Sequence, residues 1–572
     1  MRASAAANGL TVHAVAGTYT VLLGFDLADP AGCLGFGIRR TDHDEGETRW
    51  LRGMKTFESV VPNPPPGSDY STRTEPIQSF QWGDYTAKPG HHYSYDVSAL
   101  SGQPSALVVL ATVTVEVTAE DEDDGIHGIW FNRGVAGSQA FEKRFPGFTP
   151  GPDVDEADAA MVWLSRGLGE AFTGFCAEAL GPGWALRGAF YEFTWGTGLT
   201  ALAAARDRGA DVALVIHGRD SDSAAATEAG EDDDTTAADA REAAQKYGLT
   251  DLITWRTAPN KSALMHDKFL VLLHHGSPVA VWTGSTNLTR GAVFGHSNVG
   301  HLIRDTTVAR DFLHEWQRLQ TPDTTAQLRT LHESENAVAE QVPATRKVGR
   351  VFSPRATNST VLQWYSDVFA DAGQSAHITG AFGLNEVFRD KLGVAEPSVV
   401  RTVLLDKVPP ASGRIPLTDP NVRLSTGSHL AAGPLDQWAA EHLTGFNTHV
   451  KYIHTKIILI DPLTDDPTVL TGSANYSGAS TTSNEENTVV IRGGSSRAAG
   501  RAAVRRVADI YLTEYHRLFM HSVFRAWAQG RSINDGQRRS IGYLEETDGW
   551  TARYYRDGAW EALQRKVFSG QG

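Results

Sequence analysis

The first quarter of the chain alternates apolar and polar residues in a repeat of two. Residues 112–118 read Thr-Val-Thr-Val-Glu-Val-Thr, so the three valines share one face of an extended chain. A similar alternation covers residues 93–97. A repeat of two with β-branched residues is typical of strands with one buried face. The pattern predicts an all-β domain over residues 1–148.

A Pro-Gly turn comes directly before the alternating stretch at residues 93–97. The sequence there is Lys88-Pro89-Gly90-His91-His92-Tyr93-Ser94-Tyr95-Asp96-Val97. It resembles the tyrosine corner of fibronectin type III domains, in which a tyrosine hydroxyl bonds back to the chain upstream. The resemblance implies a fibronectin- or immunoglobulin-like β-sandwich with no chemistry of its own.

Beyond residue 150, helical and extended patterns alternate. Helices are expected over residues 160–180, 198–208 and 240–247, and strands over 184–193, 211–217, 251–256, 265–273 and 279–284. This βαβ alternation is typical of an α/β sheet flanked by helices.

The same region contains one unit written twice. Four segments recur in the same order: Gly188-Ala189-Phe190 as Gly380-Ala381-Phe382, His266-Asp267-Lys268 as His454-Thr455-Lys456, Gly284-Ser285-Thr286-Asn287 as Gly472-Ser473-Ala474-Asn475, and a helix around Glu315 as one around Glu514. A period near 190 residues indicates an internal duplication. We therefore expect two similar α/β halves, 149–345 and 346–530, packed around a shared cleft. An aromatic-rich tail, 531–572, is expected to pack on this core.

Composition adds limits rather than detail. The chain has 572 residues, 41% hydrophobic and 21% charged, as in ordinary globular proteins of several domains. No apolar run is long enough to span a membrane, and none near Met1 suits a signal peptide, which favours the cytoplasm. A secreted form whose signal has been removed stays open. With only Cys33 and Cys176, a disulfide framework and a Cys-rich zinc site are excluded.

The net charge of −15 is concentrated in two acidic runs. Residues 220–239 hold eight acidic residues without Lys or Arg, and residues 120–124 hold five in a row. Both are expected to be solvated loops. The remaining charges nearly balance, so the net charge says little about the substrate.

The duplicated motifs carry the candidate chemistry. Side chains two apart on a strand project to one face, so His266 and Lys268 point into one space, as do His454 and Lys456. The following Gly-Ser-x-Asn turns should let a serine hydroxyl and an asparagine amide approach a ligand. These residues are Ser285 and Asn287 in the first copy and Ser473 and Asn475 in the second.

This set of side chains suits a phosphodiester. Ammonium groups and amides can hold the nonbridging oxygens, the work that metal ions do elsewhere. One neutral imidazole can attack phosphorus, and the other can protonate the leaving oxygen. No carboxylate-rich cage accompanies the motifs, so neither a metal nor another cofactor is expected. The pairs His91-His92 and His274-His275 are interpreted as surface histidines.

His-x-Lys, an apolar run, Asp and Gly-Ser-x-Asn, present twice, resemble the phospholipase D superfamily over about residues 150–525. The second copy fits well and includes Asp461 at the motif's Asp position. The first copy has Leu273 at that position. In the family this Asp is thought to maintain the motif's structure, so the resemblance implies a limited effect of Leu273 on activity.

The resemblance also implies a carboxylate behind one catalytic histidine. Family members place it shortly after Gly-Ser-x-Asn, on the distal nitrogen of the histidine from the opposite half. Here Glu486 is the candidate, with Glu485 beside it, and Ser297 is taken as the corresponding position in the first copy. We therefore expect Glu486 to orient His266 as the nucleophile, with His454 as the general acid.

Several functions remain in competition at this point. A phospholipid-cleaving phosphodiesterase is favoured, because both motifs lie on one chain and Lys/Arg runs are lacking. A DNA or RNA nuclease of the same superfamily and a non-catalytic binding protein are the alternatives. Since one chain supplies both motifs, catalysis does not require a dimer. Whether water or an alcohol is the second substrate stays open.

Overall fold

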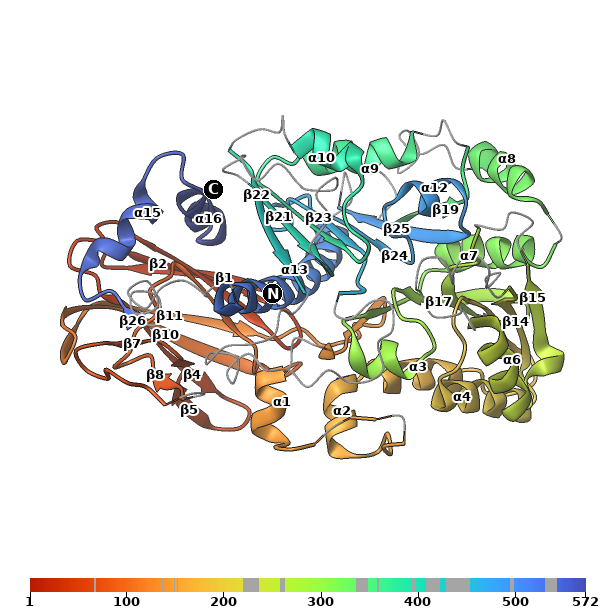
Figure 1. Ribbon diagram of the computed structural model, residues 1–572, viewed down its shortest axis with the longest axis horizontal. Coiled ribbons are helices and arrows are strands. Elements are labelled where there is room, and N and C mark those ends of the chain that lie inside the picture. The colour runs from red at the N-terminus through yellow and green to blue at the C-terminus, as the bar shows by residue number, and fades with distance from the viewer. Residues whose placement is uncertain are drawn as a thin grey trace.

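The chain folds into a β-rich unit at one end and two α/β units at the other (Figure 1). The computed structural model describes residues 1–65, 68–134, 138–148, 150–151, 153–219, 236–257, 263–321, 323–335, 348–356, 360–392, 398–407, 422–427, 453–493, 498–529 and 543–571. Residues 220–235, most of the longer acidic run, lie outside this description.

The β-rich unit is a sandwich of two four-stranded antiparallel sheets, as predicted. One sheet has the order β1 (Arg2–Ala7), β2 (Leu10–Ala16), β3 (Val21–Leu27), β9 (Gln81–Asp84). The other has the order β11 (Ala106–Thr118), β10 (His92–Gln103), β4 (Gly35–Asp42), β5 (Glu47–Trp50). Short pairs join β6 (Arg52–Gly53) to β8 (Tyr70–Ser71) and β7 (Thr56–Phe57) to β26 (Tyr543–Leu544). The inward faces carry the expected valines, since Val113, Val115 and Val117 are buried.

The turn before β10 has the geometry expected of a tyrosine corner. The backbone N–H of Lys88 donates to the Tyr93 hydroxyl at 2.8 Å. Tyr93 is fully buried. The hydroxyl therefore satisfies a turn amide while the ring fills the sandwich core.

The acidic run at residues 120–124 is a largely exposed loop, as expected, but its carboxylates also form ion pairs. Glu120 and Asp124 lie 3.3 Å from Arg506, and Asp123 lies 3.1 Å from Arg304. This run therefore joins the end of the sandwich to the α/β units by ion pairs, which its composition alone does not reveal.

Each α/β unit contains a seven-stranded mixed sheet, and the two sheets have the same strand order. The first is β12 (His127–Phe131), β18 (Val299–Ile303), β17 (Ser277–Gly284), β16 (Lys268–His274), β13 (Trp184–Phe190), β14 (Asp211–His217), β15 (Ile253–Arg256). The second is β19 (Val348–Ser353), β25 (Glu486–Arg492), β24 (Thr468–Gly472), β23 (Ile457–Ile460), β20 (Ser375–Gly380), β21 (Val400–Leu405), β22 (Val422–Thr426). The duplication expected from the repeated motifs is thus a duplication of topology.

Helices flank both sheets. They are α1 (Ser138–Arg144), α2 (Ala159–Ser165), α3 (Leu168–Ala177), α4 (Gly196–Asp207), α6 (Thr236–Lys246), α7 (Thr306–Leu319), α8 (Thr325–Glu335), α9 (Val361–Ala370), α10 (Glu386–Leu392), α12 (Gly478–Thr482), α13 (Ala498–Gln529), α15 (Ala552–Tyr555) and α16 (Trp560–Phe568). Single turns occupy η2 (Thr250–Leu252), η3 (Gly291–Gly295) and η5 (Asp548–Thr551).

Three details differ from the sequence predictions. Strand β12 falls within residues 1–148 but pairs with β18, so it belongs to the first α/β sheet. The helix expected over 160–180 is two helices, because Arg166 and Gly167 have φ of 48° and 83°, which breaks the helix. The repeated Gly-Ala-Phe triplets are out of register, since β13 ends at Phe190 and the equivalent β20 ends at Gly380.

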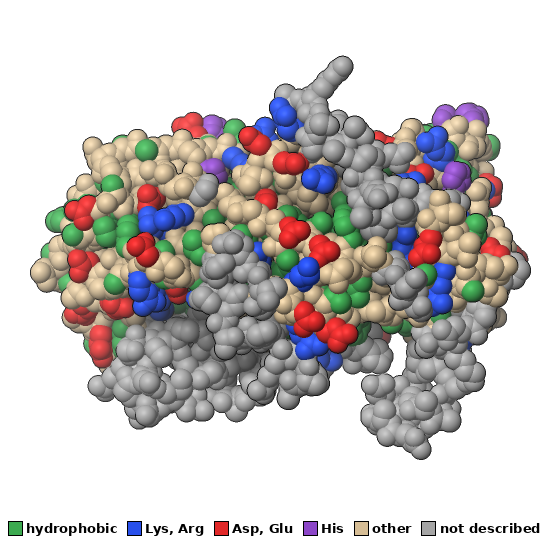
Figure 2. Space-filling model, turned by 90° about the horizontal axis from the view of Figure 1, so that it is seen from above, with side chains coloured by type: hydrophobic (Ala, Val, Ile, Leu, Met, Phe, Trp, Pro, Cys, Tyr) green, Lys and Arg blue, Asp and Glu red, His purple; other side chains and the backbone are tan. Residues whose placement is uncertain are grey.

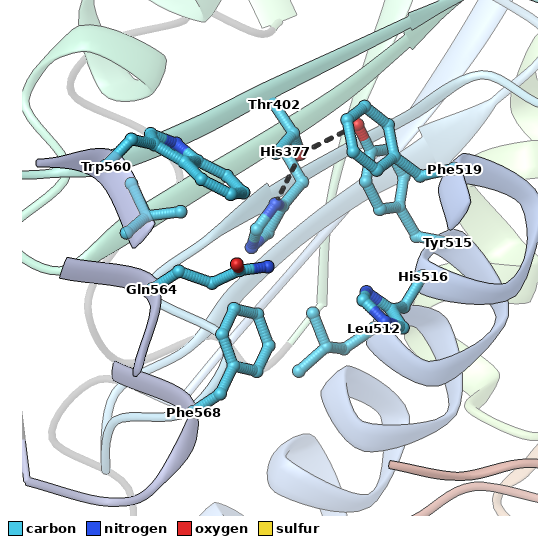
Figure 3. Close-up of a pocket in the computed structure, with 10 residues that line it drawn as sticks. His377, Thr402, Leu512, Tyr515, His516, Phe519, Trp560, Gln564 and Phe568 are labelled. Carbon is cyan, nitrogen blue, oxygen red and sulfur yellow. Dashed lines mark hydrogen bonds between the residues drawn. The ribbon is translucent and has the colours of Figure 1, made fainter. Parts of the chain in front are cut away.

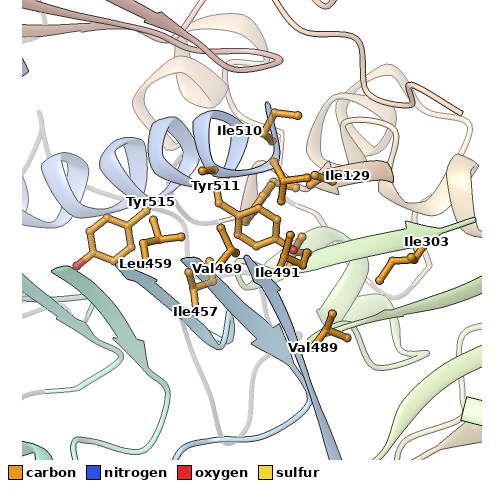
Figure 4. Close-up of a cluster of buried hydrophobic side chains, with 14 of the residues drawn as sticks. Ile129, Ile303, Ile457, Leu459, Val469, Val489, Ile491, Ile510, Tyr511 and Tyr515 are labelled. Atoms are coloured by element: carbon orange, nitrogen blue, oxygen red, sulfur yellow. The ribbon is translucent and has the colours of Figure 1, made fainter. Parts of the chain in front are cut away.

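A continuous apolar core joins the two halves. It combines strands of both sheets with α7 and α13, including Ile129, Ile303, Leu459 and Tyr511 (Figure 4). Because α13 contacts the sandwich as well as both sheets, all three units share this core.

The C-terminal tail packs on two units at once. Trp550 and Tyr554 enter the sandwich core, whereas Trp560 and Phe568 on α16 join the core shared by the halves. Figure 3 shows α16 closing a small pocket against β20, β21 and α13, in which His377, Thr402 and Tyr515 form a hydrogen-bonded chain. None of the candidate site residues lines this pocket.

Candidate active site

The two His-x-Lys motifs meet where the halves interlock. The backbone N–H of His266 donates to the Glu485 carbonyl at 2.9 Å, and that of His454 donates to the Ser297 carbonyl at 3.1 Å. Each histidine is thus held by the backbone of the opposite half. Both side chains are buried, at 6% and 4% exposure.

The lysines repeat this symmetry. Lys268 Nζ donates to the His266 carbonyl, and Lys456 Nζ donates to the His454 carbonyl, each at 2.7 Å. Burial lowers the pKa of Lys268 to about 8, an effect that Glu486 and Glu192 oppose. Burial and then the charge of Lys268 hold the pKa of Lys456 well below its usual range. The two ammonium groups therefore repel each other inside one small space, which favours an anionic ligand between them.

His266 faces a carboxylate from the opposite half, at the place predicted for Glu486. Its Nδ1 lies 3.4 Å from Glu486 Oε1. Glu486 is fully buried and accepts from Ser480 Oγ at 3.1 Å and from Asn484 Nδ2 at 3.0 Å. Burial and then Lys268 lower the pKa of His266 to about 4, and Glu486 opposes this shift. The neutral imidazole therefore keeps an unprotonated nitrogen at neutral pH.

His454 faces an amide instead. Its Nδ1 lies 2.9 Å from Asn298 Oδ1. Asn298, not Ser297, therefore corresponds to Glu486, and the predicted alignment was one residue out. Asn298 Nδ2 donates to the Ala292 carbonyl at 2.9 Å, which fixes the amide orientation. Because Oδ1 can only accept, His454 carries its proton on Nδ1 in the neutral form and turns Nε2 toward the site.

A third histidine lies beside His454, and sequence reasoning did not assign it a role. The rings of His296 and His454 are 4.8 Å apart, edge to face. His296 Nδ1 lies 2.7 Å from Asn298 Nδ2, so it accepts from that amide. Burial and Lys456 lower the pKa of His296 to about 3. Burial and then Lys456 also hold the pKa of His454 well below its usual value.

The glycines of the two Gly-Ser-x-Asn motifs are needed because a neighbouring strand lies too close for a side chain. Gly284 and Gly472 have φ of 135° and 154°, and a Cβ on either would lie 2.2 or 2.3 Å from a neighbouring strand carbonyl. No other residue adopts this conformation in so little space without strain. The glycines thus bring the ends of β17 and β24 against β18 and β25.

The hydroxyls of the two motif serines, which we expected to approach a ligand, are bound by neighbouring protein groups. Ser285 Oγ donates to Asn298 Oδ1 at 2.7 Å and accepts from the Val299 N–H at 3.1 Å. Ser473 Oγ accepts from the Asn487 N–H at 3.0 Å. Both are fully buried, so they position the segment that faces His266 and His454.

The motif asparagines present amides that the protein leaves partly unsatisfied. Asn287 Oδ1 and Asn475 Oδ1 are buried without a hydrogen-bond partner among the described residues. Asn287 Nδ2 donates to Glu192, a carboxylate that sequence reasoning missed. The available signal was its place, two residues beyond the buried strand that ends at Phe190.

Asp461 acts on the backbone away from the reacting groups. Its carboxylate accepts from the N–H groups of Gly373, Gln374 and Ser375 at 2.7–2.9 Å, at the start of β20. Leu273, at the same motif position, is buried in the shared core and pairs with Ala185. Both contacts are structural.

A known protein-family model matches the part of the chain that carries these motifs. The model "Cardiolipin synthase, PLD-like domain" matches residues 185–320 and 417–504, one segment in each half. The two α/β units thus match the PLD-like domain of the phospholipase D superfamily, as the repeated motifs predicted. Members of the phospholipase D superfamily transfer phosphoryl groups. A comparison with curated proteins finds no match.

Three solved structures of bacterial proteins are similar to parts of this chain. Phosphatidylserine synthase from Haemophilus influenzae is 12% identical, over 63% of this chain and 93% of its own, with a TM-score of 0.40. Polyphosphate kinase from Porphyromonas gingivalis is 13% identical, over 60% of this chain and 45% of its own, with a TM-score of 0.37. Nuc from Salmonella typhimurium, a phospholipase D family member, is 28% identical over 26% of this chain and 84% of its own, with a TM-score of 0.19.

Two further observations concern membrane-spanning helices and groups that could bind a metal ion. Among the described helices, none is both long and apolar enough to cross a membrane. Within the described residues, the His/Asp/Glu group close enough to share a metal ion is Asp42, Asp44 and His91 in the sandwich, not the candidate site.

Proposed function

We propose that this chain is a metal-independent phosphodiesterase that hydrolyses a phosphodiester, with phospholipid favoured, through a phosphohistidine intermediate. The observation that carries the proposal is the unequal partnership of two otherwise equivalent histidines. His266 has a buried carboxylate behind it, and His454 has an amide. A carboxylate stabilises the positive charge that develops on an attacking imidazole, whereas an amide does not.

In the first step, His266 is the nucleophile. Glu486 faces its Nδ1 at 3.4 Å and favours the proton on that atom, so the Nε2 lone pair forms a bond to phosphorus while the bond to the leaving oxygen breaks. The proton on His454 Nε2 passes to that oxygen, and the alcohol departs. The negative charge of the bound phosphodiester favours the protonated form of His454, which burial alone disfavours.

In the second step, the neutral His454 removes a proton from water. The water oxygen forms a bond to phosphorus, and the phosphorus–nitrogen bond breaks. The products are a phosphomonoester, neutral His266 and protonated His454, so both groups return to their starting state. Lys268, Lys456, Asn287 and Asn475 hold the nonbridging oxygens throughout.

The distribution of charge favours phospholipid over nucleic acid. A nonspecific nuclease needs a continuous set of cations to neutralise phosphates. On the face shown in Figure 2, Lys and Arg side chains of the described residues are interspersed with Asp and Glu, and they form no continuous basic band. A substrate with one phosphodiester suits such a surface better than a polyanion.

The test is a turnover assay in EDTA with two substrates side by side. One arm offers vesicles of mixed phospholipids, and the other offers single- and double-stranded DNA and RNA, with His266→Ala as the blank. We expect headgroup release that needs His266 and is unaffected by EDTA. Cleavage of nucleic acid alone would replace the substrate assignment, and activity restored only by a divalent ion would overturn the metal-independent mechanism.

A further inference from the structure

The two halves differ at one position close to the reacting groups. β13 and β20 are equivalent strands whose last residues, Phe190 and Gly380, pair with Ile216 and Leu405. Glu192 therefore corresponds to Phe382, which is 66% exposed. The duplicated site has a carboxylate at this place in the first half and an apolar ring in the second.

Glu192 is bound to the site rather than directed away from it. Its Oε2 accepts from Asn287 Nδ2, one of the amides that hold the substrate oxygens in our proposal. An amide nitrogen has two hydrogens, so the second stays available for a ligand. The negative charge of Glu192 also opposes the lowering of the pKa of Lys268 and of Lys456 by burial.

The charges around this carboxylate set the net charge of the site. Lys268, Lys456 and, in the proposed mechanism, protonated His454 carry positive charge, and the carboxylates of Glu486 and Asp406 oppose it. Glu192 removes a further unit of positive charge from the site. A phosphodiester carries a single negative charge, whereas a phosphomonoester carries nearly two above a pKa of about 6.

We propose that Glu192 is a specificity-determining residue that matches the site to a singly charged phosphodiester and weakens binding of the doubly charged phosphomonoester product. The inference rests on the proposed function and adds to it. A carboxylate beside the phosphoryl group repels a second negative charge on the ligand as well as the first. It therefore speeds departure of the product more than it weakens binding of the substrate.

The test compares diethyl phosphate, singly charged at every pH used, with ethyl phosphate, doubly charged at pH 8 and singly charged at pH 5. Inhibition constants for both are measured against turnover of a chromogenic phosphodiester. The proteins are wild type, Glu192→Gln, Glu192→Asp and the control Asp251→Asn, which removes the same formal charge from an exposed position outside the motifs. Thermal melting verifies folding of each.

At pH 8, we expect Glu192→Gln to lower the inhibition constant of ethyl phosphate about tenfold more than that of diethyl phosphate. This is roughly the effect of removing one charge from a half-buried site. The difference should vanish at pH 5, and Glu192→Asp and Asp251→Asn should behave as wild type. Equal changes for both inhibitors, or a pH-independent difference, would overturn the role of Glu192 alone. Failure of the wild-type protein to hydrolyse any phosphodiester would instead overturn the proposed function on which this role rests.

Discussion

Replacing Glu486 with glutamine tests the assignment of roles to the two histidines. The change is isosteric and removes only the charge that faces His266 at 3.4 Å. At an effective dielectric of about 20, a unit charge pair at this range is worth about 4 kcal/mol. Because glutamine retains a hydrogen bond, we expect about 3–4 kcal/mol of transition-state stabilisation to be lost. That corresponds to a fall in kcat of about 10²–10³-fold.

The neighbouring residue supplies a matched control. Glu485 forms a buried ion pair with Arg256 of the other half, at 2.7 Å, and only its backbone contacts His266. Glu485→Gln leaves the Arg256 charge without its partner, so it should lower stability by roughly 3–5 kcal/mol while the folded fraction retains its rate. Glu486→Gln should show the reverse pattern.

The assay is single-turnover cleavage of a chromogenic phosphodiester, with melting curves for both variants. Leaving-group release in Glu486→Gln should slow in the first turnover, since the defect lies in the attack by His266. A rate within fivefold of wild type would refute the reasoning. An equal loss of rate in Glu485→Gln would also refute it, because both effects would then be structural.

Three further predictions address other parts of the account. In the first turnover, His454→Ala should lose the release of alkyl leaving groups but retain much of the release of p-nitrophenolate, which needs no proton; equal losses on both would contradict its role as the acid. Leu273→Asp should change the melting temperature more than kcat, and a large gain in rate would show that the first motif is impaired. The melting temperature should fall as the pH drops from 7 to 4.5, because His266, His296 and His377 have folded pKa values of about 4, 3 and 3. Below pH 6.5 these histidines are protonated in the unfolded chain but stay neutral in the folded one, so each lowers the free energy of unfolding by up to about 1.4 kcal/mol per pH unit. A melting temperature that does not change with pH would contradict this.

Much of the site was predictable because it is duplicated. Two His-x-Lys motifs at the same offset had to lie at equivalent places, and both motifs stand at the start of equivalent strands, with His266 just before β16 and His454 just before β23. Glu486 is predictable as the partner of a histidine because a carboxylate follows the second motif and none follows the first at the same place. The offset that relates Gly284 to Gly472 places Asn298, not Ser297, opposite Glu486.

What sequence could not supply was the direction of small polar side chains. Ser285 and Ser473 bind backbone groups that only the neighbouring strands reveal. Glu192 lacks a motif because its partner, Asn287, is 95 residues away along the chain. The exposure of the acidic run at residues 120–124 was predictable, whereas its ion pairs with Arg506 depend on how α13 packs against it.

Trapping the covalent intermediate tests the central claim most directly. His454→Ala is mixed with a p-nitrophenyl phosphodiester, quenched at alkaline pH, where phosphohistidine is preserved, and digested for mass spectrometry. The account predicts a phosphorylated His266, because leaving-group departure needs no acid here while hydrolysis lacks its base. Phosphorylation of another residue, or product formed in a burst-free reaction with no modified histidine, would contradict it.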